Sequence, residues 1–294
     1  MRIELKDVRK SFDGVEALRG VSLTIPAGRK VALIGPNGSG KTTLTRILMG
    51  LLACSGEVLL DGCPPFSRRA ELAARLAYVP QTAPLMSAKV REIVGVIAVA
   101  RGIEPRAIAS TAWGLGLDCE AAADVAVREL SGGMRQKLML ALALSARADL
   151  FILDEPTASL DSISRQGFFH LYEEIAGGAT LILCSHRLEE IQHLVDQVVA
   201  LESGKVVFDG PVAEFLDSRT VGIIEVYTRT EHRAEWLSSC GFSRGASGAW
   251  ARTVSRAEKV RLLGEIAATC GGEFANIIVR DVEYVDPARG SQAE

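Results

Sequence analysis

Short runs of apolar residues without polar interruption mark three places along the chain. These runs are Val31 to Ile34, Leu150 to Leu153 and Leu181 to Cys184, and each is followed by a turn and then a helical pattern. Unbroken apolarity is typical of strands that are covered on both faces, as in a parallel sheet flanked by helices. The pattern therefore predicts an α/β fold with a buried parallel sheet.

Alternating patterns near the amino-terminal end predict a second kind of strand. Ile3 and Leu5 alternate with charged residues, and apolar residues alternate with polar ones over 21–25. Alternation is typical of strands with one solvated face, so we expect antiparallel strands at the edge of the sheet. Between residues 84 and 147 strand patterns give way to helical ones, which predicts a helical insertion of about these bounds.

The pattern changes again near residue 218. A polar stretch over 217–219 is typical of a linker, and new strand and helix patterns follow it. We therefore predict a main domain over residues 1–217 and a small accessory domain over 218–294.

The accessory domain has the composition of a small α+β unit. Strand-like residues cover 223–228 and 277–285, and a helical stretch covers 231–240. A second helical pattern has apolar residues at Val260, Leu263, Ala267 and Cys270. The spacing gives this helix one apolar face to bury. The final residues, 287–294, are typical of a frayed end.

Composition limits the classes of function. The chain has 294 residues, is 48% hydrophobic and carries a formal net charge of -3. This charge argues against binding of nucleic acid through phosphate neutralisation, so we expect no nucleic-acid partner. No apolar stretch approaches the roughly 18 residues that a membrane span needs, and the first residues do not have the pattern of a secretory signal. We expect a cytoplasmic location.

A glycine-rich segment follows the first apolar run and begins a helical pattern. Its residues are Gly35, Pro36, Asn37, Gly38, Ser39, Gly40, Lys41, Thr42 and Thr43. Glycines let successive N–H groups turn toward a phosphate, and the helix start adds its positive end. In such a loop the lysine contacts the β- and γ-phosphates and the following hydroxyl ligates Mg²⁺. The loop predicts nucleotide binding, and by itself it does not distinguish a GTPase or small-molecule kinase from a transport motor.

Two carboxylates, Asp154 and Glu155, end the second apolar run. Neighbouring strand residues point to opposite faces, so the two are suited to different tasks. We predict that Asp154 holds Mg²⁺ through water and that Glu155 is the general base, which is typically worth about 10²–10⁴ in rate. The alternative, a pair of solvated turn acids, leaves the preceding apolar run unexplained.

A second glycine-containing segment precedes a strong helical pattern over 135–146. The N–H groups of Ser131, Gly132 and Gly133 and the Ser131 hydroxyl form an anion site at the helix start. The alternative is a helix cap without a further role. Because the chain already has a phosphate loop, the segment is better suited to cover a nucleotide that another copy holds.

Together these motifs resemble the ATP-binding cassette (ABC) family, whose two motor domains hold ATP between them. The resemblance covers residues 1–216 and rests on the phosphate loop, on Leu130–Met134 and on the run that ends at Glu155. It implies a RecA-like P-loop core with an antiparallel β edge and a helical arm. It also implies ATP and Mg²⁺ as cofactors, a homodimer around ATP, and a separately encoded membrane permease that docks near 84–101.

The resemblance assigns roles to further residues. Gln81 matches the residue that joins Mg²⁺ and the attacking water to the permease, and His186 matches the family's switch histidine. Phe12 lies where the family stacks an aromatic ring on adenine, although a core phenylalanine in an edge strand fits the sequence as well. Met134 replaces the usual Gln of the family, and this change leaves the backbone donors and the Ser131 hydroxyl in place.

The resemblance also narrows the function. A single cassette followed by a small α+β domain is similar to the ATPase subunits of ABC-2-type exporters, although residues 286–289 depart from the usual tail. Leu130–Gln136 and Val279–Val282 are similar to the ATPase that assists copper-site assembly in nitrous-oxide reductase. We expect an ATP-hydrolysing subunit held at the inner face of the membrane by its permease. One alternative is a soluble family member that acts on ribosomes or DNA. A second alternative, a P-loop kinase or GTPase, leaves residues 131–133 without a role.

Overall fold

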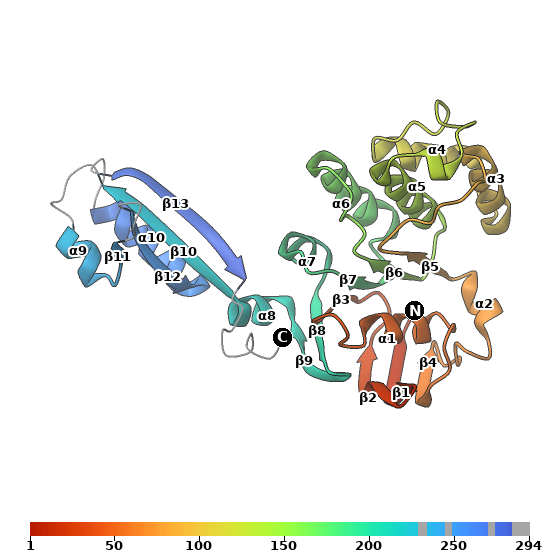
Figure 1. Cartoon of the computed structure of the whole chain (residues 1–294), viewed down its shortest axis with the longest axis horizontal. Coiled ribbons are helices and arrows are strands. Elements are labelled where there is room, and N and C mark those ends of the chain that lie inside the picture. The colour runs from red at the N-terminus through yellow and green to blue at the C-terminus, as the bar shows by residue number, and fades with distance from the viewer. Residues whose placement is uncertain (229–233, 245–248, 270–273, 284–294) are drawn as a thin grey trace. The chain divides into compact units, whose positions relative to one another are not determined.

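The computed structural model describes residues 1–228, 234–244, 249–269 and 274–283. The chain divides into two compact units, Met1–Val212 and Ala213–Glu294, which are described separately here (Figure 1). The division lies at the start of α8 (Val212–Arg219). This helix includes residues 217–219, where the sequence pattern indicates a linker, so the polar stretch there is helical.

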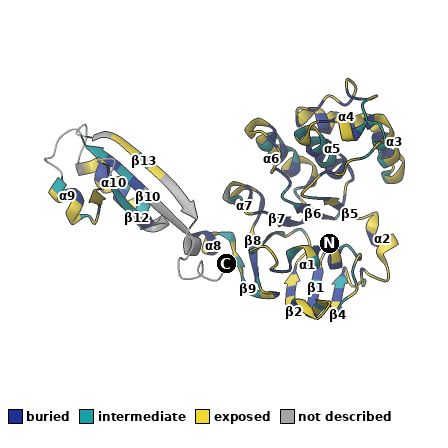
Figure 2. Ribbon diagram, viewed as in Figure 1, coloured by how far each residue is buried: buried dark blue, intermediate teal, exposed yellow. Residues whose placement is uncertain are grey.

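A six-stranded sheet forms the centre of the first unit. Its order is β5-β6-β7-β3-β8-β9, and only the β8–β9 pair is antiparallel. The strands are β3 (Lys30–Ile34), β5 (Leu76–Val79), β6 (Leu150–Asp154), β7 (Thr180–Cys184), β8 (Gln197–Glu202) and β9 (Lys205–Pro211). The three unbroken apolar runs form β3, β6 and β7 and are largely buried (Figure 2), which confirms the predicted parallel sheet.

A three-stranded antiparallel sheet, ordered β2-β1-β4, lies beside the central sheet. Its strands are β1 (Ile3–Phe12), β2 (Val15–Ile25) and β4 (Ser55–Leu60). An Asp13-Gly14 turn joins β1 to β2, and both residues have the positive φ that tight hairpin turns favour. The inward residues of this sheet share one apolar core with α1 (Lys41–Leu48) and the central strands. The predicted antiparallel edge is confirmed.

Helices make up the predicted insertion over residues 84–147, all of which the structure describes. They are α3 (Val90–Arg101), α4 (Pro105–Gly114), the short 3₁₀ helix η1 (Val127–Glu129) and α5 (Gly132–Ser145). The remaining helices of the unit are α2 (Arg69–Ala73), α6 (Ser162–Ala176) and α7 (Leu188–Leu194). The predicted helical arm is therefore present between β5 and β6.

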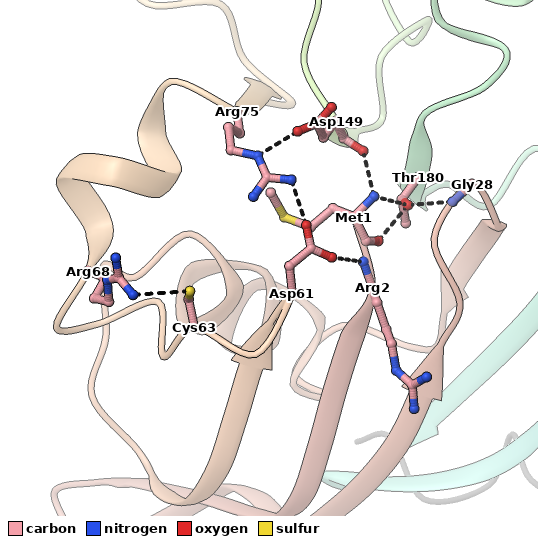
Figure 3. A network of polar contacts seen from close by, with 9 residues as sticks. All are labelled: Met1, Arg2, Gly28, Asp61, Cys63, Arg68, Arg75, Asp149 and Thr180. Carbon is pink, nitrogen blue, oxygen red and sulfur yellow. Dashed lines mark hydrogen bonds and ion pairs between the residues drawn. The ribbon is translucent and has the colours of Figure 1, made fainter.

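A polar network joins the two sheets at the amino ends of the parallel strands (Figure 3). Arg75 donates to Asp149 from Nε and to Asp61 from Nη2, each over 2.6 Å. The buried Thr180 hydroxyl accepts a hydrogen bond from the Gly28 N–H over 2.9 Å. These contacts tie Arg75, before β5, to the residue before β6, and the loop before β3 to the start of β7, so they lie at the ends of the strands opposite the candidate site.

The second unit has the order β–α–β–β–α–β. Its elements are β10 (Thr220–Thr228), α9 (Ala234–Ser239), β11 (Ser243–Arg244), β12 (Trp250–Ser255), α10 (Arg256–Thr269) and β13 (Phe274–Glu283). The strands pair antiparallel in the order β11-β12-β10-β13, which is the arrangement of the split β-α-β, or ferredoxin-like, fold. The second unit is thus an α+β unit, as the sequence pattern predicts.

The buried face of α10 lies one position away from the predicted one. Leu262 and Ile266 are buried in the unit's core, whereas Leu263 is half-buried and Ala267 is exposed. Burying Ile266 in place of Ala267 removes more apolar surface from water. Cys270 and residues 287–294 lie outside the described residues.

Candidate functional site

The carboxyl ends of neighbouring parallel strands bring the candidate residues to one edge of the central sheet. The glycine-rich loop follows β3, Glu155 follows β6, His186 follows β7 and Gln81 follows β5. The carboxyl edge of an open parallel sheet is where α/β folds bind ligands. The topology therefore unites motifs that lie far apart in the sequence.

Three glycines with positive φ bend the backbone of the loop over residues 35–40. The φ values are 148° at Gly35, 79° at Gly38 and 107° at Gly40. A side chain at Gly35 would overlap the carbonyl oxygen of Leu201, and one at Gly40 would come 2.7 Å from that of Ala17. Glycine is therefore required here both by the backbone conformation and by close packing.

The groups that line this loop are suited to an anion. Lys41 Nζ donates to the carbonyl oxygens of Gly35 and Pro36 over 2.6 and 3.0 Å, so its charge lies on the loop itself. Gly40 caps α1 without a side chain, and the first turn of α1 has no acidic residue. The Ser39 hydroxyl is buried and has no hydrogen-bond partner among the residues that the structure describes. A phosphate site needs donors at a helix start that are not used elsewhere, and this loop provides them.

Asp154 and Glu155 have different surroundings, but not because they alternate along a strand. β6 ends at Asp154, and Glu155 lies in the following turn with φ 46°, a conformation that non-glycine residues rarely adopt. The Glu155 N–H donates to the Cys184 carbonyl oxygen over 2.8 Å, which fixes this turn against the end of β7. The strand-face interpretation of Glu155 is therefore wrong, since the turn and not the pleat sets its direction.

The two carboxylates also differ in electrostatic environment. Burial raises the pKa of the half-buried Asp154, and the charge of Glu155 raises that pKa further. The positive charge of Lys41 opposes this shift, which indicates that Lys41 and Asp154 lie near each other. A half-buried carboxylate beside the phosphate-loop lysine is favourably placed for a cation.

Glu155 and His186 are in direct contact. His186 Nδ1 lies 2.6 Å from Glu155 Oε1. The Glu155 side chain is 14% exposed and that of His186 is 76% exposed. The second carboxylate oxygen, Oε2, is buried without a hydrogen-bond partner in the described part of the chain. The sequence predicts Glu155 and His186 as separate site residues. The structure brings them into contact as a pair and leaves Glu155 Oε2 without a hydrogen bond from the described residues.

The other predicted residues on this edge are accessible. Thr42 at the start of α1 and Gln81 after β5 are exposed, and Thr43 is half-buried. Phe12, at the end of β1, is 43% exposed and has Lys10 Nζ 5.2 Å from its ring centroid. The alternative of a core phenylalanine is therefore wrong, because the hairpin end carries the ring into solvent.

The segment over residues 131–133 begins α5. Ser131 is the N-cap, and its hydroxyl oxygen accepts a hydrogen bond from the Met134 N–H over 3.2 Å. Its hydroxyl proton is not used in this contact. Gly132 is exposed, and a side chain there would meet only Arg135 Nη2 at 4.0 Å, whereas one at Gly133 would press on the Ser159 carbonyl oxygen at 3.0 Å. The segment is both a helix cap and an accessible set of donors.

Sequence reasoning missed two links between α5 and the turn after β6. Gln136 is buried, and its Nε2 donates to the Pro156 carbonyl oxygen over 3.0 Å. Lys137 Nζ lies 3.5 Å from Asp161, whose pKa is lowered to about 2 by hydrogen bonds from Ser164 at the start of α6. The three adjacent polar residues Arg135, Gln136 and Lys137 before an apolar helical run are the signal that could have found these contacts.

The residues present fit a divalent cation by their donor chemistry. Thr42 offers a hydroxyl, Asp154 a carboxylate and Gln81 an amide oxygen, and hard cations such as Mg²⁺ prefer oxygen ligands. Burial and Glu155 raise the pKa of Asp154, and a bound cation would oppose that shift as Lys41 does.

Comparisons with known proteins identify the same family that the motifs resemble. The family model described as "ABC transporter" matches residues 18–158. The chain is 34% identical to the Nod factor export ATP-binding protein I of Rhizobium meliloti (strain 1021), over 81% of this chain and 72% of that protein. It is 36% identical to the aliphatic sulfonates import ATP-binding protein SsuB 1 of Rhizobium johnstonii, over 71% of this chain and 77% of that protein.

Solved structures resemble it as well. The structure of an ATP-binding subunit of an ABC transporter superposes with a TM-score of 0.66 at 25% identity, over 74% of this chain and 93% of that chain. A bacterial Atm1-family ABC exporter with ATP bound gives a TM-score of 0.65 at 26% identity, over 73% of this chain and 39% of that chain.

Proposed function

This chain belongs to the family of ABC transporter ATP-binding subunits, and we propose that it drives export. It binds and hydrolyses ATP and works with membrane permease components, as its relatives and structural neighbours indicate. None of the helices that the structure describes has both the length and the apolarity needed to cross a bilayer. The proposed location is the cytoplasmic face of the membrane, through the permease.

The second unit supports export rather than import. The match to the Nod factor export protein covers 81% of this chain, more than Met1–Val212 alone can supply, so it continues into the second unit. The match to the sulfonate import protein covers 71%, which the first unit can accommodate. The assignment to ABC-2-type exporters rests on this extension and on the single cassette that precedes it.

A narrower function is copper-site maturation of nitrous-oxide reductase. Its support is the similarity of Leu130–Gln136 and Val279–Val282, which lie at the start of α5 and in β13, to that system's ATPase. Neighbouring genes test it: a periplasmic copper-handling protein beside this gene would support the assignment, and a different cargo system would contradict it.

The pair formed by Glu155 and His186 carries the proposed chemistry. Oε1 of Glu155 is held by His186, which orients the carboxylate for its proposed role of accepting a proton from the attacking water. The phosphate loop, with Lys41, binds the triphosphate, and Phe12 stacks on adenine. Thr42, Asp154 and Gln81 would hold Mg²⁺, which neutralises phosphate charge when bound.

We propose a homodimer in which each ATP contacts both chains. One chain would wrap the phosphates with residues 35–42, and the partner copy would close the site with Ser131, Gly132 and Gly133. The hydroxyl proton of Ser131, which its capping contact does not use, and the exposure of Gly132 support this arrangement. In such a symmetric dimer the same two surfaces meet twice.

The helical arm is the proposed docking surface for the permease. Val96 and Val99, one helical turn apart on α3, are 63% and 86% exposed, and the nearby Leu85 is exposed too. Exposed apolar side chains that gather on one surface mark interaction sites.

ATPase activity measured with the co-purified permease tests this assignment. We expect the permease to stimulate hydrolysis, and we expect the double variant Val96→Ser, Val99→Ser to lose that stimulation while it keeps its basal rate. Val207→Ser on β9 removes an exposed valine elsewhere and serves as the matched control. Stimulation by ribosomes or DNA instead of the permease would favour the soluble alternative.

A further inference from the structure

A buried carboxylate lies close to the Glu155–His186 pair. Glu190, on α7, is 0% exposed, while its neighbour Glu189 is exposed and pairs with Arg165 over 3.0 Å. A glutamate is rarely buried without being fully paired, because desolvation of a carboxylate is costly. Burial raises the pKa of Glu190, and the charge of Glu155 acts in the same direction.

Glu190 contacts both segments that carry the catalytic pair. The buried Thr157 hydroxyl, two residues after Glu155, donates to Glu190 Oε1. Arg187 Nε, one residue after His186, lies 3.8 Å from the same oxygen. The Arg187 N–H in turn donates to the Ser185 hydroxyl over 3.1 Å. One side chain therefore joins the turn after β6 to the turn after β7.

Further contacts hold the turn after β6 from other directions. The Cys184 carbonyl oxygen holds the Glu155 N–H, and Gln136 holds the Pro156 carbonyl oxygen. The first of these contacts joins the turn to the end of β7, two residues before His186. Glu190 adds a side-chain link between the two turns, beside the contact of Glu155 with His186 itself.

Stability alone does not account for a carboxylate at this position. Its Oε2 is buried and has no hydrogen-bond partner among the described residues. An apolar side chain of similar size often stabilises such a site as well as a buried charged group or better. The unpaired oxygen therefore indicates a role other than holding the fold together.

We propose that Glu190 is a positioning residue for ATP hydrolysis. By accepting the Thr157 hydrogen bond and pairing with the charge of Arg187, it helps to hold Glu155 Oε1 against His186 Nδ1. This inference rests on the proposed function, in which Glu155 is the general base. Glu190 itself does not touch the nucleotide.

The variant Glu190→Met tests the proposal, since methionine has a similar length and accepts no hydrogen bond from Thr157. We expect kcat to fall about tenfold or more, as misplacement of a catalytic group does, with KM for ATP unchanged. We expect the melting temperature to stay the same or rise. Glu189→Met, the same change one residue earlier on the exposed side of α7, should keep the wild-type kcat.

A second pair of variants tests the contact from the other side. Thr157→Val should lower kcat as Glu190→Met does, and Thr157→Ser, which keeps the hydroxyl, should restore it. A wild-type kcat in both Glu190→Met and Thr157→Val would overturn the proposal. A parallel loss of melting temperature and ATP affinity would also overturn it, because that result means a structural role. Glu155→Gln in the same assay separates failure of the proposed function from failure of this inference. If Glu155→Gln stays active, the role of Glu155 as general base has failed, independently of the results for Glu190.

Discussion

The two glycine-containing segments that begin α1 and α5 both offer N–H groups to an anion, yet they are built differently. Before α1, three glycines have positive φ, and two of them leave no room for a side chain. At the start of α5, neither Gly132 nor Gly133 has positive φ, and the Ser131 side chain caps the helix in the ordinary way. The first segment has the backbone of a loop that can enclose a phosphate, and the second presents only a helix start.

This difference indicates how much each segment can do alone. A loop that encloses a phosphate must bend back on itself, and only glycine permits that backbone at low cost. A surface that closes a site from outside needs only free donors and a positive helix end. The comparison supports two unequal halves of one ATP site, supplied by two chains.

The largest expected effect is on hydrolysis, at the edge of the sheet that carries the loop before α1. Glu155→Gln removes the proposed base but keeps its size, so we expect kcat to fall by about 10²–10⁴ while ATP still binds. Blocked hydrolysis should then trap dimers, which sedimentation with ATP and Mg²⁺ would measure. Glu174→Gln, on an exposed part of α6, is the control. A Glu155→Gln variant that remains monomeric with ATP would contradict the proposed closure by a second chain.

The smallest expected effect concerns adenine, at the hairpin end of the edge sheet. Phe12→Ala removes the exposed ring, and we expect ATP affinity to fall by about 1 kcal/mol, the lower end of what stacking on a base contributes. Phe12→Tyr should bind ATP like the wild type, because it keeps the π face. Phe66→Ala, another exposed phenylalanine, is the control in a fluorescent-nucleotide titration. Equal affinity in all of these variants would remove Phe12 from the site.

Much of the first unit could be predicted because its signals are local. The apolar runs of β3, β6 and β7 need no knowledge of distant residues, since burial on both faces alone explains them. The phosphate loop could be recognised from its own residues too, because its glycine spacing is a local pattern, although Leu201 and Ala17 also crowd two of these glycines. The helical arm could be located from the loss of strand patterns between β5 and β6.

The features that could not be predicted depend on contacts between distant segments. The turn at Glu155 is set by the Cys184 carbonyl oxygen, and a strand pattern does not extend to that turn. Glu189 and Glu190 are identical residues side by side, and only the packing of α7 buries one of them. The sole local hint is that Glu190 shares a helix face with the buried Leu194.

The central claim is that one chain holds only half of each ATP site, and mixing two inactive variants tests it most directly. Lys41→Ala disables the enclosing half, and Gly132→Asp places a carboxylate on the closing half, at an exposed helix start that tolerates it. Each variant alone should be nearly inactive. In the mixed dimer one site combines both intact halves, so an equal mixture should regain about a quarter of the wild-type ATPase rate. A mixture no more active than the sum of its parts would contradict the account.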